Sequence, residues 1–253
     1  MRKGWRSPLK EKPLRNPGQS LDEEIQNLFD LEINSYLLIS LCVLFLAGYE
    51  WFRWYVELPY QPVIFTIVAI VVCLFSTWKI RGFMAKANRL KQGRDGEKIV
   101  GQYLDNLKAS GYRVFHDIVC DGFNIDHVVI CEHGLFTIET KTYSKPGSGR
   151  SEVNVNGDQI TVNGFTTEKI VHQAKAEADW LRQLLLETTG ETHPIRPVVL
   201  FPEWYVNSSQ ASPDIWVLNP KALPTFIANT PKLLSKQQVM QATYAVARYI
   251  KTT

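Results

Sequence analysis

Two stretches near the start of the chain carry no charged residue over lengths that suit a membrane span. Residues 33–49 are free of charge over seventeen positions, and residues 58–78 over twenty-one positions. A bilayer core needs about 20 apolar residues in helical form, with a working range of about 17–25. The sequence therefore predicts a transmembrane helical hairpin, with helices over about residues 34–51 and 60–78.

Aromatic residues mark the ends of both stretches, as the interfacial belts of membrane proteins do. They are Tyr36, Trp51, Trp54, Tyr55, Tyr60 and Trp78. A helical hairpin buried in a soluble protein is the alternative. A cleavable signal peptide fits less well, because the first apolar run starts at residue 33 and no small-residue cleavage pattern follows it.

Lysine and arginine predict the orientation of the hairpin. The loop between the spans holds only Arg53, whereas both outer flanks are basic. The flanking residues are Arg2, Lys3, Arg6, Lys10, Lys12 and Arg15 before the spans, and Lys79, Arg81, Lys86, Arg89 and Lys91 after them. By the positive-inside rule, both ends lie in the cytoplasm. We thus expect a multi-pass protein of the inner (cytoplasmic) membrane with its soluble domain in the cytoplasm.

The chain divides accordingly into four parts. Residues 1–32 form a basic and acidic tail, residues 33–80 hold the two spans, residues 81–92 form a basic linker, and residues 93–253 form the soluble domain. This last part is long enough for one good-sized hydrophobic core.

The soluble domain alternates helical and strand patterns of an α/β fold. The sequence predicts a helix that opens near Gly93, a long helix capped at Thr166 or Thr167, and a last helix opened by a Ser235/Gln238 capping box. Predicted strands cover residues 112–119, 124–131, 135–142, 153–155, 160–162, 197–201 and 215–218. Together they indicate a mixed sheet flanked by helices.

Two carboxylates stand in or beside apolar strand patterns, where an ionised group is costly unless something pairs with it. Asp126 falls in one predicted strand and Glu139 near the end of the next. Side chains alternate across a strand, so Glu139 and Lys141 project from the same face. One carboxylate from each strand and a lysine can therefore converge on one point.

Two carboxylates suit a hard cation such as Mg²⁺, which also takes substrate phosphate oxygens as ligands. The lysine can orient or deprotonate an attacking water, or hold a phosphate. These are the parts of metal-assisted phosphodiester hydrolysis. Taken alone, a Glu-x-Lys pair is equally a solvated ion pair.

Further elements strengthen the hydrolytic interpretation through a family resemblance. The chain resembles the nuclease-related domain (NERD) proteins of the PD-(D/E)xK nuclease superfamily, from about Gly93 to Leu186. The matching elements are Gly93-x-x-Gly96-Glu97, the strand 125–130 around Asp126, the segment 134–141 that ends in Glu139-Thr140-Lys141, and a helix carrying Gln173.

The resemblance implies a restriction-endonuclease-like fold and a role for each matching polar residue. It makes Asp126, Glu139 and the Thr140 backbone carbonyl ligands of Mg²⁺, with Mn²⁺ as a substitute, Lys141 the catalytic lysine, Glu97 a supporting acid and further ligand, and Gln173 an auxiliary polar residue of the catalytic site. It also implies nucleic acid as substrate and makes a homodimer plausible.

Charge argues against an easy nuclease assignment. From Gly93 onward there are sixteen Lys and Arg against seventeen Asp and Glu, whereas non-specific binding to DNA normally needs a basic surface. A local patch for nucleic acid remains, formed by Lys145, Arg150, Lys169 and Lys175. Neighbouring glutamates make an ordinary solvated surface the alternative.

Three functions are consistent with the sequence. The first is a membrane-anchored, Mg²⁺-dependent nuclease that hydrolyses phosphodiester bonds, of DNA ahead of RNA, at the cytoplasmic membrane face. The second is a catalytically inactive module of the same fold that binds nucleic acid or a protein partner at the bilayer. The third is a structural membrane protein in which the polar residues only fix the sheet.

Overall fold

A computed structural model describes residues 14–145 and 151–252. The chain divides into two compact units, which are described separately. One unit is Leu21–Gln92, and the other combines Met1–Ser20 with Gly93–Thr253.

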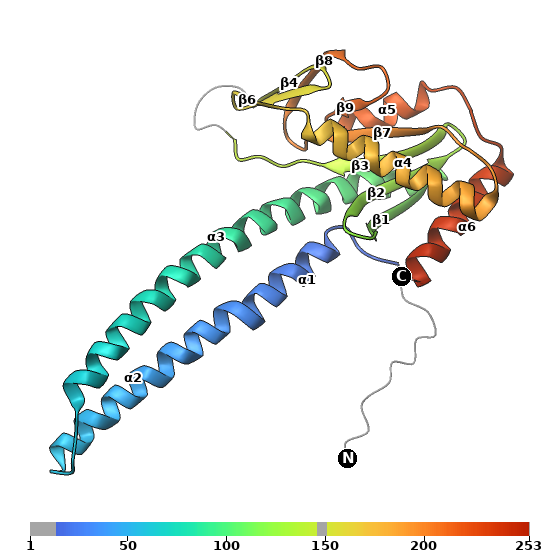
Figure 1. Cartoon of the computed structure of the whole chain (residues 1–253). Helices are drawn as coiled ribbons and strands as arrows, with labels where there is room; N and C mark the ends of the chain where they lie inside the picture. The colour runs from blue at the N-terminus through green and yellow to red at the C-terminus, as the bar shows by residue number, and fades with distance from the viewer. Residues whose placement is uncertain (1–13, 146–150, 253) are drawn as a thin grey trace, which may run out of the picture. The chain divides into compact units, whose positions relative to one another are not determined.

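The first unit is helical. Two helical stretches, Gln19–Tyr55 and Pro62–Lys108, are long and apolar enough to cross a membrane. In the most apolar part of each stretch, 11% is buried within the protein. Large apolar side chains on them face outward, with Phe45 72% and Leu74 68% exposed. The first stretch is built from α1 (Gln19–Asn27), a π-helical turn η1 (Leu28–Ile33) and α2 (Asn34–Tyr55), and the second is α3 (Pro62–Lys108) (Figure 1). The predicted pair of apolar helices is therefore present.

Helix α3 corrects one expectation from the sequence. A helix was expected to open near Gly93, but α3 continues without a break through Gly93 and Gly96 to Lys108. Glycine costs a helix about 1 kcal/mol relative to alanine, which made a boundary plausible there. Gly96 has a packing reason instead, because a Cβ at this position would lie 2.0 Å from Thr142 Cγ2.

The second unit is built on a five-stranded mixed sheet in the order β1-β2-β3-β7-β9. Neighbours β1, β2 and β3 are antiparallel, while β3, β7 and β9 are parallel. The strands are β1 (Arg113–Val119), β2 (Asn124–Cys131), β3 (Gly134–Thr140), β7 (Ile195–Leu200) and β9 (Trp216–Leu218). The predicted strands of the sheet are thus confirmed, and so is the mixed α/β class with flanking helices.

Helices cover both faces of this sheet. On one face, α4 (Lys169–Thr189) and α6 (Lys236–Thr252) pack on β1, β2 and β3 through a core that includes Ile118, Leu181 and Val246. On the other face, the end of α3 and the short α5 (Leu223–Ala228) bury Leu104 and Ile227. Figure 1 shows α4 lying across the sheet.

A second sheet of four strands, in the order β6-β5-β4-β8, packs against the first part of α4. The predicted strands 153–155 and 160–162 are present and form a hairpin, with Asn156 paired to Gln159 and Gly157 at φ +58° in the turn. The strands are β4 (Glu152–Gly157), β5 (Gln159–Val162), β6 (Phe165–Thr167) and β8 (Tyr205–Ala211), of which β6 and β8 were not predicted.

Helix ends were predicted with mixed success. The capping box of α6 is confirmed, because Ser235 and Gln238 each donate a backbone N–H to the other's side chain, at 3.0 and 3.2 Å. At α4 the N-cap is Glu168, not Thr166 or Thr167. Thr167 nevertheless contributes, because its Oγ1 accepts a hydrogen bond from the backbone N–H of Lys169 at 3.2 Å.

Candidate active site

The candidate site lies where β2 and β3 separate, at the carboxyl end of β3. Regular pairing stops at His127 and Ile138, so Asp126 and Glu139 stand in the opening between the strands. The backbone N–H of Thr140 donates to Asp126 Oδ2 at 2.7 Å. The N–H and C=O of one strand residue face the same neighbour, so the Thr140 carbonyl also faces β2.

Lys141 and Gln173 join the two carboxylates to helix α4. Lys141 Nζ donates to Glu139 Oε1 and, at 3.0 Å, to Gln173 Oε1. Gln173 Nε2 in turn donates to Glu177 Oε1 at 2.9 Å. Strand β3 thus meets α4 through a continuous chain of polar contacts.

Glu97 enters from helix α3. The absence of a Cβ at Gly96 lets this part of the helix approach Thr142, just beyond β3. Glu97 is buried, and burial raises its pKa to about 8, helped by the nearby carboxylates of Asp117 and Glu139. The structure therefore brings together all five of the predicted side chains: Glu97, Asp126, Glu139, Lys141 and Gln173. Their roles stay predictions.

Two more carboxyl groups in this cluster have pKa values raised by their surroundings. Burial raises the pKa of Asp126 well above its usual range, and the nearby Glu139 and Glu97 carboxylates add to this effect. Burial raises the pKa of Glu177 to about 10, reinforced by the charge of Glu139 and a hydrogen bond between the two carboxyl groups. So much buried negative charge is stable only with protons or cations beside it.

Lys141 is the cation that the structure itself supplies. Burial would lower the pKa of its ammonium group, but the charge of Glu139 and the hydrogen bond with it outweigh burial and raise this pKa. Lys141 therefore stays protonated at neutral pH. It is suited to hold a phosphate oxygen or orient a water, rather than to remove a proton from one.

The site has unsatisfied oxygens that suit a divalent cation. Apart from the contact between their two carboxyl groups, the buried oxygens Glu139 Oε2 and Glu177 Oε2 have no hydrogen-bond partner. Within the described ranges, no three His, Cys, Asp or Glu side chains are already grouped as metal ligands. Lys141 and the Thr140 N–H occupy one oxygen each of Glu139 and Asp126. The donor set, hard carboxylate oxygens beside a strand carbonyl, is nevertheless the kind that Mg²⁺ prefers.

Two lysines of the expected basic patch are paired with acids. Lys145 pairs with Glu203 at 2.9 Å, and Lys175 pairs with Asp158 at 2.8 Å and Asp214 at 2.9 Å. Lys169 is exposed at the start of α4. Arg150 lies outside the residues that the structure describes.

The histidine beside Asp126 belongs to the core, as strand alternation predicts. His127 is fully buried, and its Nδ1 lies 2.9 Å from Nδ1 of His116. Burial lowers the pKa of His127 well below its usual range, so it stays neutral. One large cavity, of about 690 Å³, lies at the other end of these strands, near His133 and Lys232, and none of the clustered acids lines it.

Neither Glu177 nor Asp117 is among the site residues predicted from the sequence. Glu177 follows Gln173 by four positions on a helix, which places both side chains on one face of α4. That spacing was a usable signal. Asp117 offered none, because its contact with Glu97 and with residues before the apolar hairpin depends on tertiary structure.

Comparisons with known proteins agree with the resemblance drawn from the sequence. Residues 92–202 match NERD, the nuclease-related domain. An uncharacterized protein of Bacillus anthracis is 40% identical over 57 residues, which cover 21% of this chain and 27% of the relative. The matched segment thus spans about a quarter of that relative, and no solved structure matches the chain. The chain therefore carries a nuclease-related domain of the NERD family at residues 92–202.

Proposed function

We propose that the protein is a divalent-metal-dependent nuclease that hydrolyses phosphodiester bonds of nucleic acid, with DNA as the first substrate class to test. One observation carries the proposal. In a domain of the nuclease-related family, Asp126, Glu139 and a protonated Lys141 converge at a strand opening where two buried carboxyl oxygens have no hydrogen-bond partner apart from each other's carboxyl group.

Mg²⁺ or Mn²⁺ would be held by Asp126, Glu139 and the Thr140 carbonyl, with Glu97 and Glu177 beside them. The ion would lower the pKa of a bound water and neutralise charge on the scissile phosphate. Lys141 would hold a phosphate oxygen, because its ammonium group keeps its proton. Gln173 accepts a hydrogen bond from Lys141 and so orients the ammonium group toward the acids.

The two apolar helices would anchor the domain to the cytoplasmic face of a bilayer. The basic flanks of both apolar stretches support this orientation. The division of the chain supports it too, because residues on both sides of the hairpin belong to one unit. A chain that enters and leaves the membrane within one folded unit must do both on the same side.

The test uses the full-length protein in detergent with labelled single- and double-stranded DNA and RNA. Wild type is compared with Asp126→Asn and Lys141→Met, in Mg²⁺, in Mn²⁺ and with a chelator. Lys221→Met is the matched control, because Lys221 is exposed on the short turn Pro220–Ala222. Metal-dependent cutting that both site variants lose and the control keeps supports the proposal. No cutting and no binding of either metal by the folded wild type overturns it.

A non-catalytic binding module is the second candidate. The pairing of Lys145 and Lys175 with acids favours a protein partner for such a module, because paired lysines release fewer counterions from a nucleic acid backbone and so bind it more weakly. Such a module would still bind nucleic acid or a protein at the membrane. It predicts binding that Lys141→Met leaves intact and no cleavage under any metal condition.

A further inference from the structure

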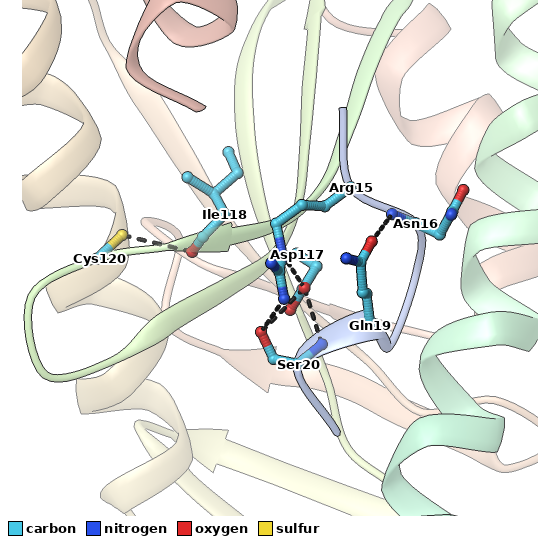
Figure 2. Close-up of polar contacts among 7 residues, drawn as sticks. All are labelled: Arg15, Asn16, Gln19, Ser20, Asp117, Ile118 and Cys120. Atoms are coloured by element: carbon cyan, nitrogen blue, oxygen red, sulfur yellow. Dashed lines mark hydrogen bonds and ion pairs between the residues drawn. The ribbon is translucent and has the colours of Figure 1, made fainter. Parts of the chain in front are cut away.

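A short segment before the apolar hairpin, Arg15–Ser20, is bonded to strand β1. Its target is Asp117, whose Oδ2 accepts hydrogen bonds from Arg15 Nε at 2.6 Å, from the Ser20 backbone N–H at 2.9 Å and from Ser20 Oγ at 2.9 Å. Arg15 also donates through Nη2 to Ser20 Oγ at 3.0 Å. Figure 2 shows Arg15 and Ser20 turned toward this one carboxylate. We refer to Arg15–Ser20 as the strap.

Asp117 occupies an unusual position in the sheet. It is 2% exposed and has φ +51°, a backbone conformation that side chains other than glycine rarely adopt. Pairing of β1 with β2 is regular at His116 and at Ile118 but not at the residue between them. By register, that residue stands opposite Asp126 of the candidate site. Backbone strain of this kind persists only where surrounding contacts hold it, and the strap supplies such contacts.

The strap also contacts the helix that carries Glu97. The backbone N–H of Gly18 donates to the Glu97 carboxyl group. Pro17 lies so close to Gly101 of α3 that a Cβ there would be 2.4 Å from Pro17 Cγ. Gly18 itself has φ +70°, and a Cβ there would lie 3.0 Å from Arg94 Cγ, so glycine suits both Gly101 on the helix and Gly18 on the strap.

We propose that the strap positions the acidic side of the nuclease site, with Arg15 and Ser20 fixing Asp117 and Gly18 fixing Glu97. The inference rests on the proposed function, since it assigns these residues a role at that site. It makes Arg15, Gly18 and Ser20 positioning residues that act through Asp117 and Glu97. It also makes a segment far from the matched domain in sequence a part of that domain's site.

The test compares full-length variants in detergent. Arg15→Gln removes the cation, while Arg15→Lys keeps the charge but cannot bridge Asp117 and Ser20 as the planar guanidinium does. Asp117→Asn and the Arg15→Gln/Asp117→Asn pair complete a double-mutant cycle. Arg113→Gln is the matched control, because Arg113 is exposed on the same strand as Asp117. Each protein is assayed for kcat, KM, thermal midpoint and Mn²⁺ affinity by electron paramagnetic resonance of the free ion.

Positioning predicts a loss of kcat of about tenfold in Arg15→Gln with KM within about twofold, because small displacements of reacting groups cost rate. Asp117→Asn loses a similar factor, the double variant loses no more than either single, and Arg15→Lys is intermediate. Arg113→Gln matches wild type. A merely structural role lowers the thermal midpoint and leaves kcat of the folded fraction unchanged.

The direction of the change in Mn²⁺ affinity distinguishes two effects of Arg15→Gln: misplacement of Glu97 and loss of the positive charge of Arg15. Loss of a nearby cation alone leaves the acids less compensated and tightens Mn²⁺ binding, whereas misplacement of Glu97 weakens it. Unchanged kcat, or tighter Mn²⁺ binding, in folded Arg15→Gln overturns the strap proposal while wild-type cleavage still stands. A folded wild type that neither cuts nor binds Mn²⁺ removes the proposed function, and the strap proposal with it. If Arg15→Gln does not fold, Arg15→Lys gives the same decision.

Discussion

The Thr140 backbone amide donates a hydrogen bond to the Asp126 carboxylate at 2.7 Å, across the opening between β3 and β2. Asp126 therefore stabilises the fold as well as belonging to the candidate site. Its carboxylate accepts a hydrogen bond from a backbone N–H at the point where the pairing between β2 and β3 ends. Substitutions that separate the two tasks can test each one.

Asp126→Asn is expected to fold and to lose metal binding. Asparagine keeps a carbonyl oxygen for the Thr140 N–H but carries no charge for a cation. Asp126→Ala leaves that N–H without an acceptor and should lower the free energy of unfolding by about 1–3 kcal/mol. Denaturant unfolding and Mn²⁺ titration of both variants check this. Equal stability of the two variants would contradict the assigned structural role.

Glu177→Gln is expected to stabilise the metal-free protein at neutral pH. The pKa of Glu177 is about 10 in the folded state and 4.5 ordinarily, so the folded state keeps a proton that the unfolded chain releases. Folding stability from this group is complete below pH 4.5 and falls as the pH rises toward 10. The amide removes that loss without removing the acceptor for Gln173.

Thermal unfolding in chelator across this pH range measures the effect. We expect a midpoint higher by roughly 3–8 °C at pH 8 and little change at pH 4.5. Glu187→Gln, on the exposed side of the same helix, is the control. A midpoint difference that does not grow with pH would show that Glu177 is ionised in the folded state.

Gly96→Ala should destabilise the domain by about 1–3 kcal/mol, the usual cost of overpacking. The added Cβ would meet Thr142 Cγ2 at 2.0 Å and push α3 away from the end of β3. Gly82→Ala in the same helix has open space around its Cβ and should stabilise α3 by up to about 1 kcal/mol. Opposite shifts in the thermal midpoints would confirm the close approach, and equal shifts would refute it.

Membrane association is expected to depend on the apolar helices rather than on surface charge. The full-length protein should sediment with membranes, resist alkaline carbonate and be released by detergent. Paired Phe45→Lys and Leu74→Lys substitutions, at residues 72% and 68% exposed, should move it to the soluble fraction. Wild-type protein in the supernatant after detergent-free sedimentation would reject the transmembrane assignment.

Most of the second unit could be predicted because its strands follow a period of two residues and its helices a period of 3.6. Asp126 and Glu139 were informative because a carboxylate in an apolar strand needs a partner. The start of α3 was misplaced because glycine lowers helix propensity whatever the tertiary context, and the packing of Gly96 on Thr142 lies outside any local pattern. Strand β8 was missed because its polar residues pair with β4, far away in sequence.

Contacts between residues far apart in sequence also explain why residues 1–32 were predicted as a separate tail. The sequence of Arg15–Ser20 does not indicate that this segment binds Asp117. The residues that form the contact are 97 and 102 positions apart, and such a contact does not affect local composition or spacing. The described part of this segment, up to Ser20, belongs to the same compact unit as Gly93–Thr253.

This separation fixes an order of events during synthesis. Ser20 leaves the ribosome 97 residues before the Asp117 that it will bind, and both apolar stretches are made in between. The acidic cluster therefore cannot be completed on a nascent chain whose hairpin has not yet emerged. Closing so long a loop has an entropic cost. This cost is smaller if the two apolar helices first pack against each other and bring the ends of the loop together. The contact between Ser20 and Asp117 therefore forms only after both apolar stretches have been made, and translation products that end before Asp117 would lack it.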